Sequence, residues 1–136
     1  MSIVVGYIPT REGRAALRRA TTECETRRST LVVVHTQAAG RTFDADTMRS
    51  FEGELDRTRV RLEAAGLGIE VRRRDGGADA AEELIAVAEE REAEMIVIGL
   101  RRRTPVGKLI LGSSSQRILL DASCPVLAVK AGADEE

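Results

Sequence analysis

The segment MIVIGL, Met95–Leu100, carries no polar side chain and is rich in β-branched residues. Two other short segments are apolar at nearly every position and also rich in β-branched residues, IVVGYI at Ile3–Ile8 and TLVVVHT at Thr30–Thr36. Apolar runs without polar alternation are typical of strands that are buried on both faces. Such strands occur in parallel sheets, where helices cover both faces. These three segments therefore predict the interior of a parallel α/β sheet.

Two further strands are expected at Leu67–Arg74 and Pro125–Lys130, and amphipathic segments separate the five strands. Thr10 is a suitable N-cap for the first helix, Gly66 a suitable stop for the second, and Asp75–Gly77 a turn before the third. Alternation of strand and helix with short connections predicts a five-stranded, doubly wound, Rossmann-like α/β fold with helices on both faces of the sheet. The apolar stripes expected to face the sheet are Ala16, Leu17, Ala20 and Cys24; Met48, Phe51, Leu55 and Leu62; Ala81, Leu84, Ile85 and Ala88; and Ile118, Leu119 and Ala122.

Length and composition restrict the functional classes. The 136 residues fit one domain, with 131–136 expected to fray, and the net charge of −1 and the 2% aromatic content do not favour nucleic-acid binding. No apolar run is long enough for a signal sequence or a membrane span. Cys24 and Cys124 are too few and too far apart for a disulfide framework or a zinc site. We therefore expect a cytoplasmic protein without a metal centre.

The stretch GLRRRTPVGKLILGSSSQ, Gly99–Gln116, is the strongest candidate for a binding site. It follows a strand at the edge of the sheet where doubly wound folds bind ligands. Its end, Gly112–Ser115, places a glycine and three hydroxyls where a helix begins, and free amides at a helix start favour an anion. The alternative is a serine that merely caps the helix. A Walker A motif is excluded, because Arg102 and Leu109 stand where it requires a glycine and a hydroxyl residue.

In this stretch the sequence resembles the universal stress protein family, whose signature is a glycine, two residues, a glycine, nine residues, then a glycine with Ser or Thr. Gly99, position 102 and Gly112–Ser113 stand at those spacings, and LVVVHT and SCPVLAVK match the second and the last strand of the family. The resemblance covers essentially the whole chain. It implies the strand order 3-2-1-4-5, homodimers, and a stress-associated regulatory role without efficient catalysis. It also implies an adenine nucleotide as ligand, ATP in some members, with or without Mg²⁺.

The resemblance also implies which residues bind the nucleotide. Residues after the first strand and at the end of the second strand would hold the adenine and the ribose. The glycine-containing loop after the fourth strand would hold the phosphates. The residues implied are Ile8, Pro9, Thr10, Thr36, Gly99, Arg102, Gly112, Ser113, Ser114 and Ser115.

Two positions depart from the family pattern. Ile8 stands where ATP-binding members carry an aspartate, so a side-chain acceptor is missing. Arg102 stands at the second signature glycine, where an arginine either obstructs a ligand or offers its phosphate a charge-assisted contact.

Catalysis is not expected, and no catalytic residue is assigned. His35 is the only histidine, and its place within a buried strand favours a hydrogen-bonded core residue over a general base. Asp44 and Asp46 begin a helix and are expected to act as cap and dipole partners rather than as metal ligands. The alternatives to a nucleotide-binding regulator are a nucleotide-independent dimeric module that binds a protein partner and, less favoured, a slow ATPase.

The last strand predicts the dimer interface. In the order 3-2-1-4-5 it lies at a sheet edge, yet four consecutive residues carry no charge. An uncharged edge strand pairs readily with a second copy of itself. The interface expected consists of Val126, Leu127, Ala128 and Val129.

Overall fold

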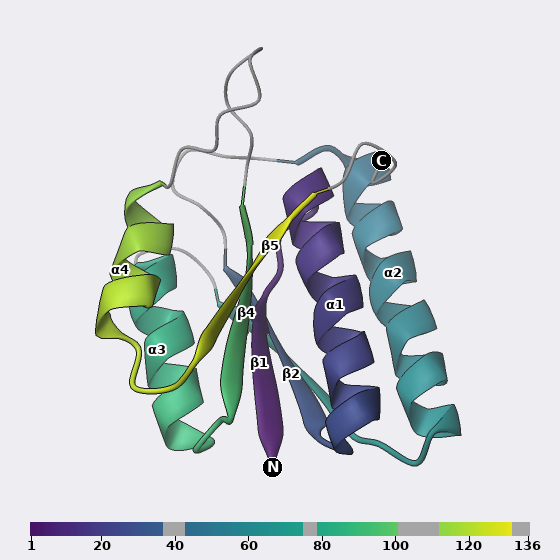
Figure 1. Ribbon diagram of the computed structural model, residues 1–136. Coiled ribbons are helices and arrows are strands. Elements are labelled where there is room, and N and C mark those ends of the chain that lie inside the picture. The colour runs from purple at the N-terminus through teal and green to yellow at the C-terminus, as the bar shows by residue number, and fades with distance from the viewer. Residues whose placement is uncertain (37–42, 75–78, 101–111, 132–136) are drawn as a thin grey trace.

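The computed structural model describes residues 1–36, 43–74, 79–100 and 112–131. Strands and helices alternate along the whole chain, as the sequence predicts (Figure 1). The elements are β1 (Ser2–Gly6), α1 (Arg11–Arg27), β2 (Thr30–Thr36), α2 (Ala45–Ala64), β3 (Ile69–Arg74), α3 (Ala80–Glu90), β4 (Met95–Leu100), α4 (Ser113–Asp121) and β5 (Val126–Lys130).

The five strands form one parallel sheet in the order β3-β2-β1-β4-β5, which confirms the fold class and the strand order. β1 lies at the centre, in register with β2 through Val4 and Val32 and with β4 through Val4 and Ile96. β1 ends two residues earlier than expected, at Gly6, although the Tyr7 amide still donates to the Val34 carbonyl at 3.0 Å. The chain therefore leaves the sheet at Tyr7 and begins the connection to α1.

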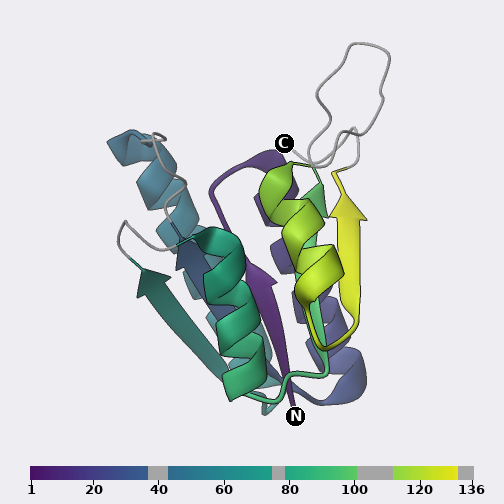
Figure 2. The ribbon, with the colours of Figure 1, turned by 90° about the vertical axis from the view of Figure 1, so that its left-hand side faces the viewer.

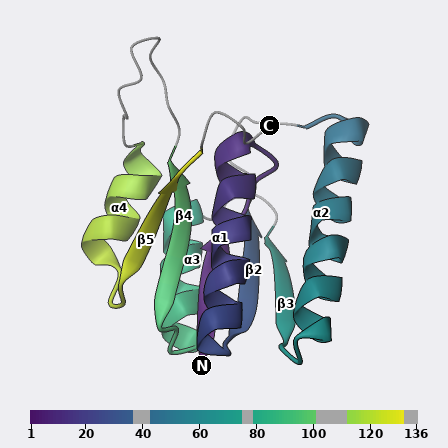
Figure 3. The same cartoon turned by 45° about the vertical axis from the view of Figure 1, so that its right-hand side comes forward.

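Helices cover both faces of the sheet. α1 and α2 lie side by side on one face (Figure 3), and α3 and α4 lie on the opposite face (Figure 2). The alternation of side chains along β1 supplies both cores: Ile3 and Val5 pack with α1 and α2, whereas Val4 packs with α3 and α4. This two-sided burial is the reason that the central strands have no polar alternation.

Helix caps follow the local sequence. The Thr10 hydroxyl accepts from the Gly13 amide at 3.1 Å, and the Asp44 carboxylate accepts from the Thr47 amide at 2.7 Å. Gly66 follows α2 with φ +75°, a conformation that favours glycine, so its expected role as a helix stop is confirmed. The expected turn at 75–77 and the tail at 132–136 lie outside the described residues.

The predicted helix stripes face the core with two exceptions, Ile85 in α3 and Leu119 in α4. Ile85 is only half-buried and belongs to neither core cluster, and Val87 is the residue of α3 that is buried in its place. Leu119 is 39% exposed, and Ile118 is the buried residue of α4. α4 is short, and Ile118 is the one residue of this helix that is fully buried, so its buried stripe is narrower than the sequence predicts. Within the described residues, no helix has the length and apolar character needed to cross a membrane.

Candidate functional site

The predicted site residues that the structure describes lie around one edge of the sheet. β1, β2 and β4 end there, and α1 and α4 begin there (Figure 1). The chain passes from β1 to β2 on one side, while β4 lies on the other side of β1. Neighbouring strands whose connections run in opposite directions leave a crevice at their carboxyl ends. The fold therefore places these residues at the position where doubly wound sheets bind ligands.

The connection after β1 offers a ligand mainly its backbone. Thr10 has an extended conformation, its amide donates to the Ile8 carbonyl at 2.8 Å, and its hydroxyl already caps α1. Pro9 is buried, and neither Ile8 nor Pro9 has a side chain that forms hydrogen bonds. Any polar contact from Ile8 or Pro9 to a nucleotide would come from main-chain atoms.

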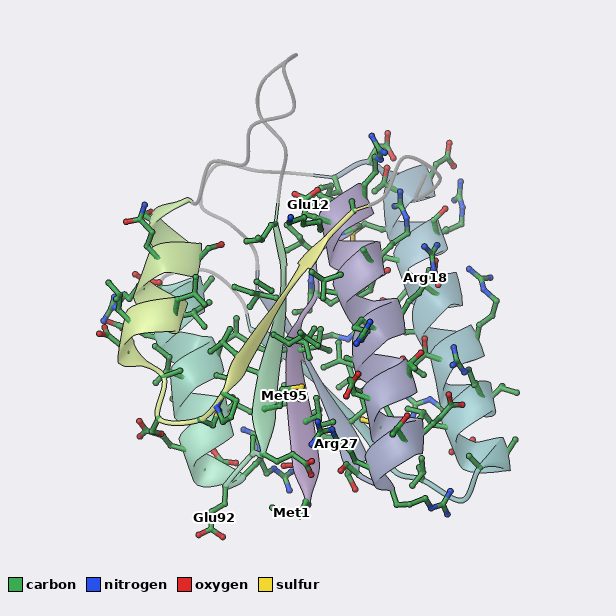
Figure 4. All side chains as sticks on the ribbon, in the orientation of Figure 1. Met1, Glu12, Arg18, Arg27, Glu92 and Met95 are labelled. Carbon is green, nitrogen blue, oxygen red and sulfur yellow. The ribbon has the colours of Figure 1, made fainter. Side chains whose placement is uncertain are left out.

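Gly99 lies against the start of α1. A Cβ atom at Gly99 would lie 2.1 Å from the carbonyl oxygen of Glu12, a residue labelled in Figure 4. The backbone of β4 and the first turn of α1 thus approach more closely than any side chain allows. This approach joins the loop after β1 to the end of β4, so packing alone is sufficient to require a glycine here.

Gly112 is in the opposite situation. It is the N-cap of α4 with an extended backbone, φ −69° and ψ 165°, which any residue adopts, and a Cβ atom there would meet nothing within 4 Å. Neither its conformation nor its packing within the described chain requires glycine. The alternative interpretation of a serine cap is wrong, because the N-cap is Gly112, which has no side chain to form a capping hydrogen bond. Ser113, Ser114 and Ser115 form the first turn, and within the described residues their amides donate to no backbone carbonyl. Amides at a helix start favour an anion.

Of the predicted site residues, Thr36 is described only by its backbone, and Arg102 is not described. Thr36 ends β2, in register with Arg74 of β3, which places its backbone at the same edge of the sheet as the loop after β1. Arg102 lies outside the described residues.

The histidine and the cysteines lie in the described part of the chain, and their surroundings differ from those of reactive groups. The His35 Nδ1 lies 3.1 Å from the Tyr7 carbonyl oxygen, and its buried ring lies 4.4 Å from the Phe51 ring, which confirms a core histidine. Burial raises the pKa of the Cys24 thiol to about 12, and nearby glutamates add to this rise, so the thiol stays protonated and unreactive. Across the described ranges, no group of histidine, cysteine and acidic residues could hold a metal ion.

Sequence reasoning missed a cavity of about 190 Å³ between α1 and α2. It is lined by Tyr7, Pro9, Arg14, Thr47, Ser50 and Phe51. Tyr7 and Phe51 stack with ring centroids 4.7 Å apart. The sole signal in the sequence is a tyrosine directly after the first strand, followed by an arginine one turn into the next helix.

Comparison with known proteins agrees with this geometry. The chain is 43% identical to a universal stress protein of Mycolicibacterium smegmatis over 128 aligned residues. The aligned region covers 94% of this chain and 96% of the relative. A solved universal stress protein of Archaeoglobus fulgidus is 29% identical, with a TM-score of 0.72 and coverage of 96% of this chain and 98% of the other. A second solved protein from that organism, in complex with dAMP, is 24% identical, with a TM-score of 0.68 and the same coverages. The model of the universal stress protein family matches residues 1–130, and the chain belongs to that family.

Proposed function

We propose that this protein is a cytoplasmic, stress-associated regulator that binds ATP at the carboxyl edge of its sheet and does not turn it over efficiently. Gly112 carries the proposal. It is a signature glycine that packing among the described residues does not require, and it begins a helix at which the N-cap forms no side-chain hydrogen bond. A glycine in open space at a helix start allows a phosphate to approach the amides closely. The dAMP complex of the Archaeoglobus fulgidus relative supports an adenine nucleotide as the ligand class.

The proposed binding mode divides the nucleotide between two sides of the site. The amides of Ser113, Ser114 and Ser115 receive the phosphates, together with Arg102 if its guanidinium contacts them. The backbone of Ile8–Thr10, with Gly99 and Thr36, borders the adenine and ribose. Because Ile8 supplies no carboxylate to the ribose, most of the polar affinity comes from the phosphate end.

A regulatory role is favoured over catalysis by the state of the potential reactive groups. His35 is buried and directed at a main-chain carbonyl, and burial raises the pKa of both cysteine thiols. Neither type of residue is placed to activate a water molecule. Two free cysteines also agree with a reducing cytoplasm.

Calorimetric titration of the purified chain with ATP tests the proposal. We expect micromolar binding, at least tenfold weaker binding of AMP, and no hydrolysis beyond the spontaneous rate in the same samples. The missing phosphates account for the difference, because a hydrogen bond to a charged group contributes about 1.5–3 kcal/mol. Nucleotide extracted from the purified protein and identified by mass provides an independent check. No heat from ATP and no extracted nucleotide would favour the partner-binding module instead.

The second part of the proposal is a homodimer that forms through β5. The two edge strands of the sheet, β3 and β5, differ in charge, and only an uncharged edge pairs readily with a second copy. Val126–Val129 carries no charge, whereas the β3 edge carries Arg72, bound to Glu70 at 2.6 Å, and Arg73, bound to Glu52 at 2.6 Å. Charged side chains protect an edge strand from pairing. β5 is therefore the edge available to a second copy, which would pair about a twofold axis.

The variant Ala128→Pro is expected to make the protein monomeric while it stays folded. The Ile96 amide donates to the Pro125 carbonyl at 2.9 Å, so in the alternating parallel pattern Ala128 directs its amide away from β4. Proline there removes an edge donor without removing a bond to β4. Light scattering at micromolar concentration measures the mass, and Ala128→Val, which keeps the amide, is the dimeric control. A monomeric wild type, or a dimeric proline variant, would contradict this interface.

A further inference from the structure

The cavity between α1 and α2 contains an unusual polar group. The Tyr7 side chain lines it and is 1% exposed, and within the described residues its hydroxyl has no hydrogen-bond partner. Buried polar atoms in proteins almost always have a partner, from the protein itself or from a bound molecule. The cavity volume of about 190 Å³ equals that of about six waters at ~30 Å³ each, so there is room for more than a single bridging water.

The cavity offers donors and one cation. Arg14 lines it, is partly buried, and forms no ion pair with any part of the chain that the structure describes. Thr47 and Ser50 add hydroxyl groups from the first turns of α2. Burial, with Glu54 next in importance, raises the pKa of Tyr7, so its hydroxyl stays protonated and able to donate. An oxyanion is the group that these donors jointly satisfy.

The charges around the Tyr7 hydroxyl also favour an anion. Arg14, Arg18 and Arg57 act on it against a single carboxylate, that of Glu54. Glu54 lies 3.7 Å from the Arg18 guanidinium and 3.9 Å from that of Arg57. The Glu54 charge is therefore compensated by two arginines that do not line the cavity, while the Arg14 charge remains available inside it.

The remaining walls are flat and apolar. The Tyr7 and Phe51 rings are nearly parallel, at 13°, and Pro9 closes the side towards the loop after β1. Ser50 is exposed, so the cavity reaches the surface. From these features we infer that the cavity is a binding site for a small, flat carboxylic acid, whose carboxylate is held by Arg14 and the Tyr7 hydroxyl and whose body lies against the two aromatic rings.

This site is separate from the proposed nucleotide site. The cavity is lined by residues of α1 and α2, and these two helices cover one face of the sheet (Figure 3). Gly112 is the N-cap of α4, a helix that covers the opposite face (Figure 2). Pro9 alone belongs to both sets of residues. The volume is also below the roughly 300 Å³ at which pockets for drug-sized ligands begin, which suits an acid with a single ring.

Titration of the isotope-labelled full chain with benzoate, followed by amide NMR spectra, tests the inference. We expect saturable shifts centred on Tyr7, Arg14, Thr47 and Ser50 with a dissociation constant on the order of 1 mM, as suits a very small ligand. Benzamide, which has the same shape without the charge, should bind at least tenfold more weakly. Saturating ATP should leave the benzoate affinity unchanged.

Matched variants separate direct contact from the general electrostatic field. Arg14→Met should weaken benzoate at least tenfold, whereas Arg57→Met, which removes a nearby cation that does not line the cavity, should change the affinity less than threefold. Tyr7→Phe should also weaken benzoate while leaving the urea unfolding midpoint unchanged or higher, because the hydroxyl that it removes has no partner in the described chain. Shifts that do not saturate, equal binding of benzamide, equal effects of Arg14→Met and Arg57→Met, or displacement of benzoate by ATP would each overturn the inference.

Discussion

Replacing Gly99 by alanine is expected to lower the free energy of unfolding by about 3 kcal/mol, at the upper end of the range for overpacked sites. The added Cβ would lie 2.1 Å from the Glu12 carbonyl oxygen and 2.6 Å from its carbon. Both atoms belong to the main chain, which cannot rotate away as a side chain can. Relief therefore requires α1 to move from β4 and to expose part of the core shared by Leu17 and Val97.

Urea unfolding followed by circular dichroism measures this effect. Gly53→Ala is the matched control, because the new Cβ would meet no closer atom than the flexible end of Arg57, at 3.3 Å. Gly53 lies inside α2, so alanine there should raise the free energy of unfolding by about 0.5–1 kcal/mol. If Gly99→Ala unfolded at the same urea concentration as the wild type, the close approach of β4 and α1 would be wrong.

Replacing Gly112 by valine is expected to have the opposite pattern, with ATP affinity lost and folding retained. The Gly112 backbone conformation suits valine, and a Cβ atom there would meet no atom of the described residues within 4 Å. The free energy of unfolding should fall by no more than about 1 kcal/mol, because valine is a poorer N-cap than glycine. The β-branched side chain would occupy the space through which a phosphate reaches the α4 amides, so ATP should bind at least tenfold more weakly, a change of about 1.4 kcal/mol or more.

Calorimetry with ATP and urea unfolding on the same preparation separate these two effects. Ser123→Val, a substitution at an exposed position beyond the far end of α4, serves as the control and should keep the ATP affinity of the wild type. Unchanged ATP binding by Gly112→Val would place the phosphates elsewhere. A large loss of stability would show that Gly112 is a packing glycine, as Gly99 is.

The sequence by itself determined the class of fold and most local boundaries. Buried strands, helix stripes and caps depend on residues a few positions apart, so they can be predicted from periodicity and local hydrogen bonding. Thr10 caps α1 and Gly66 ends α2 as predicted. The signature spacing likewise identified Gly99 and Gly112. The position of His35 within an apolar strand was sufficient to predict that it lies in the core.

The tertiary structure alone decided which of the two signature glycines is closely packed. The distinction depends on the Glu12 carbonyl, which is distant in sequence from Gly99 and adjacent in space, whereas no atom of the described residues lies within 4 Å of a Cβ atom built at Gly112. The cavity beside Tyr7 has the same origin, because its walls come from β1, α1 and α2, and no local pattern records how far apart two packed helices lie. Periodicity reports which face of an element is buried, whereas close approaches and unfilled space depend on which elements become neighbours.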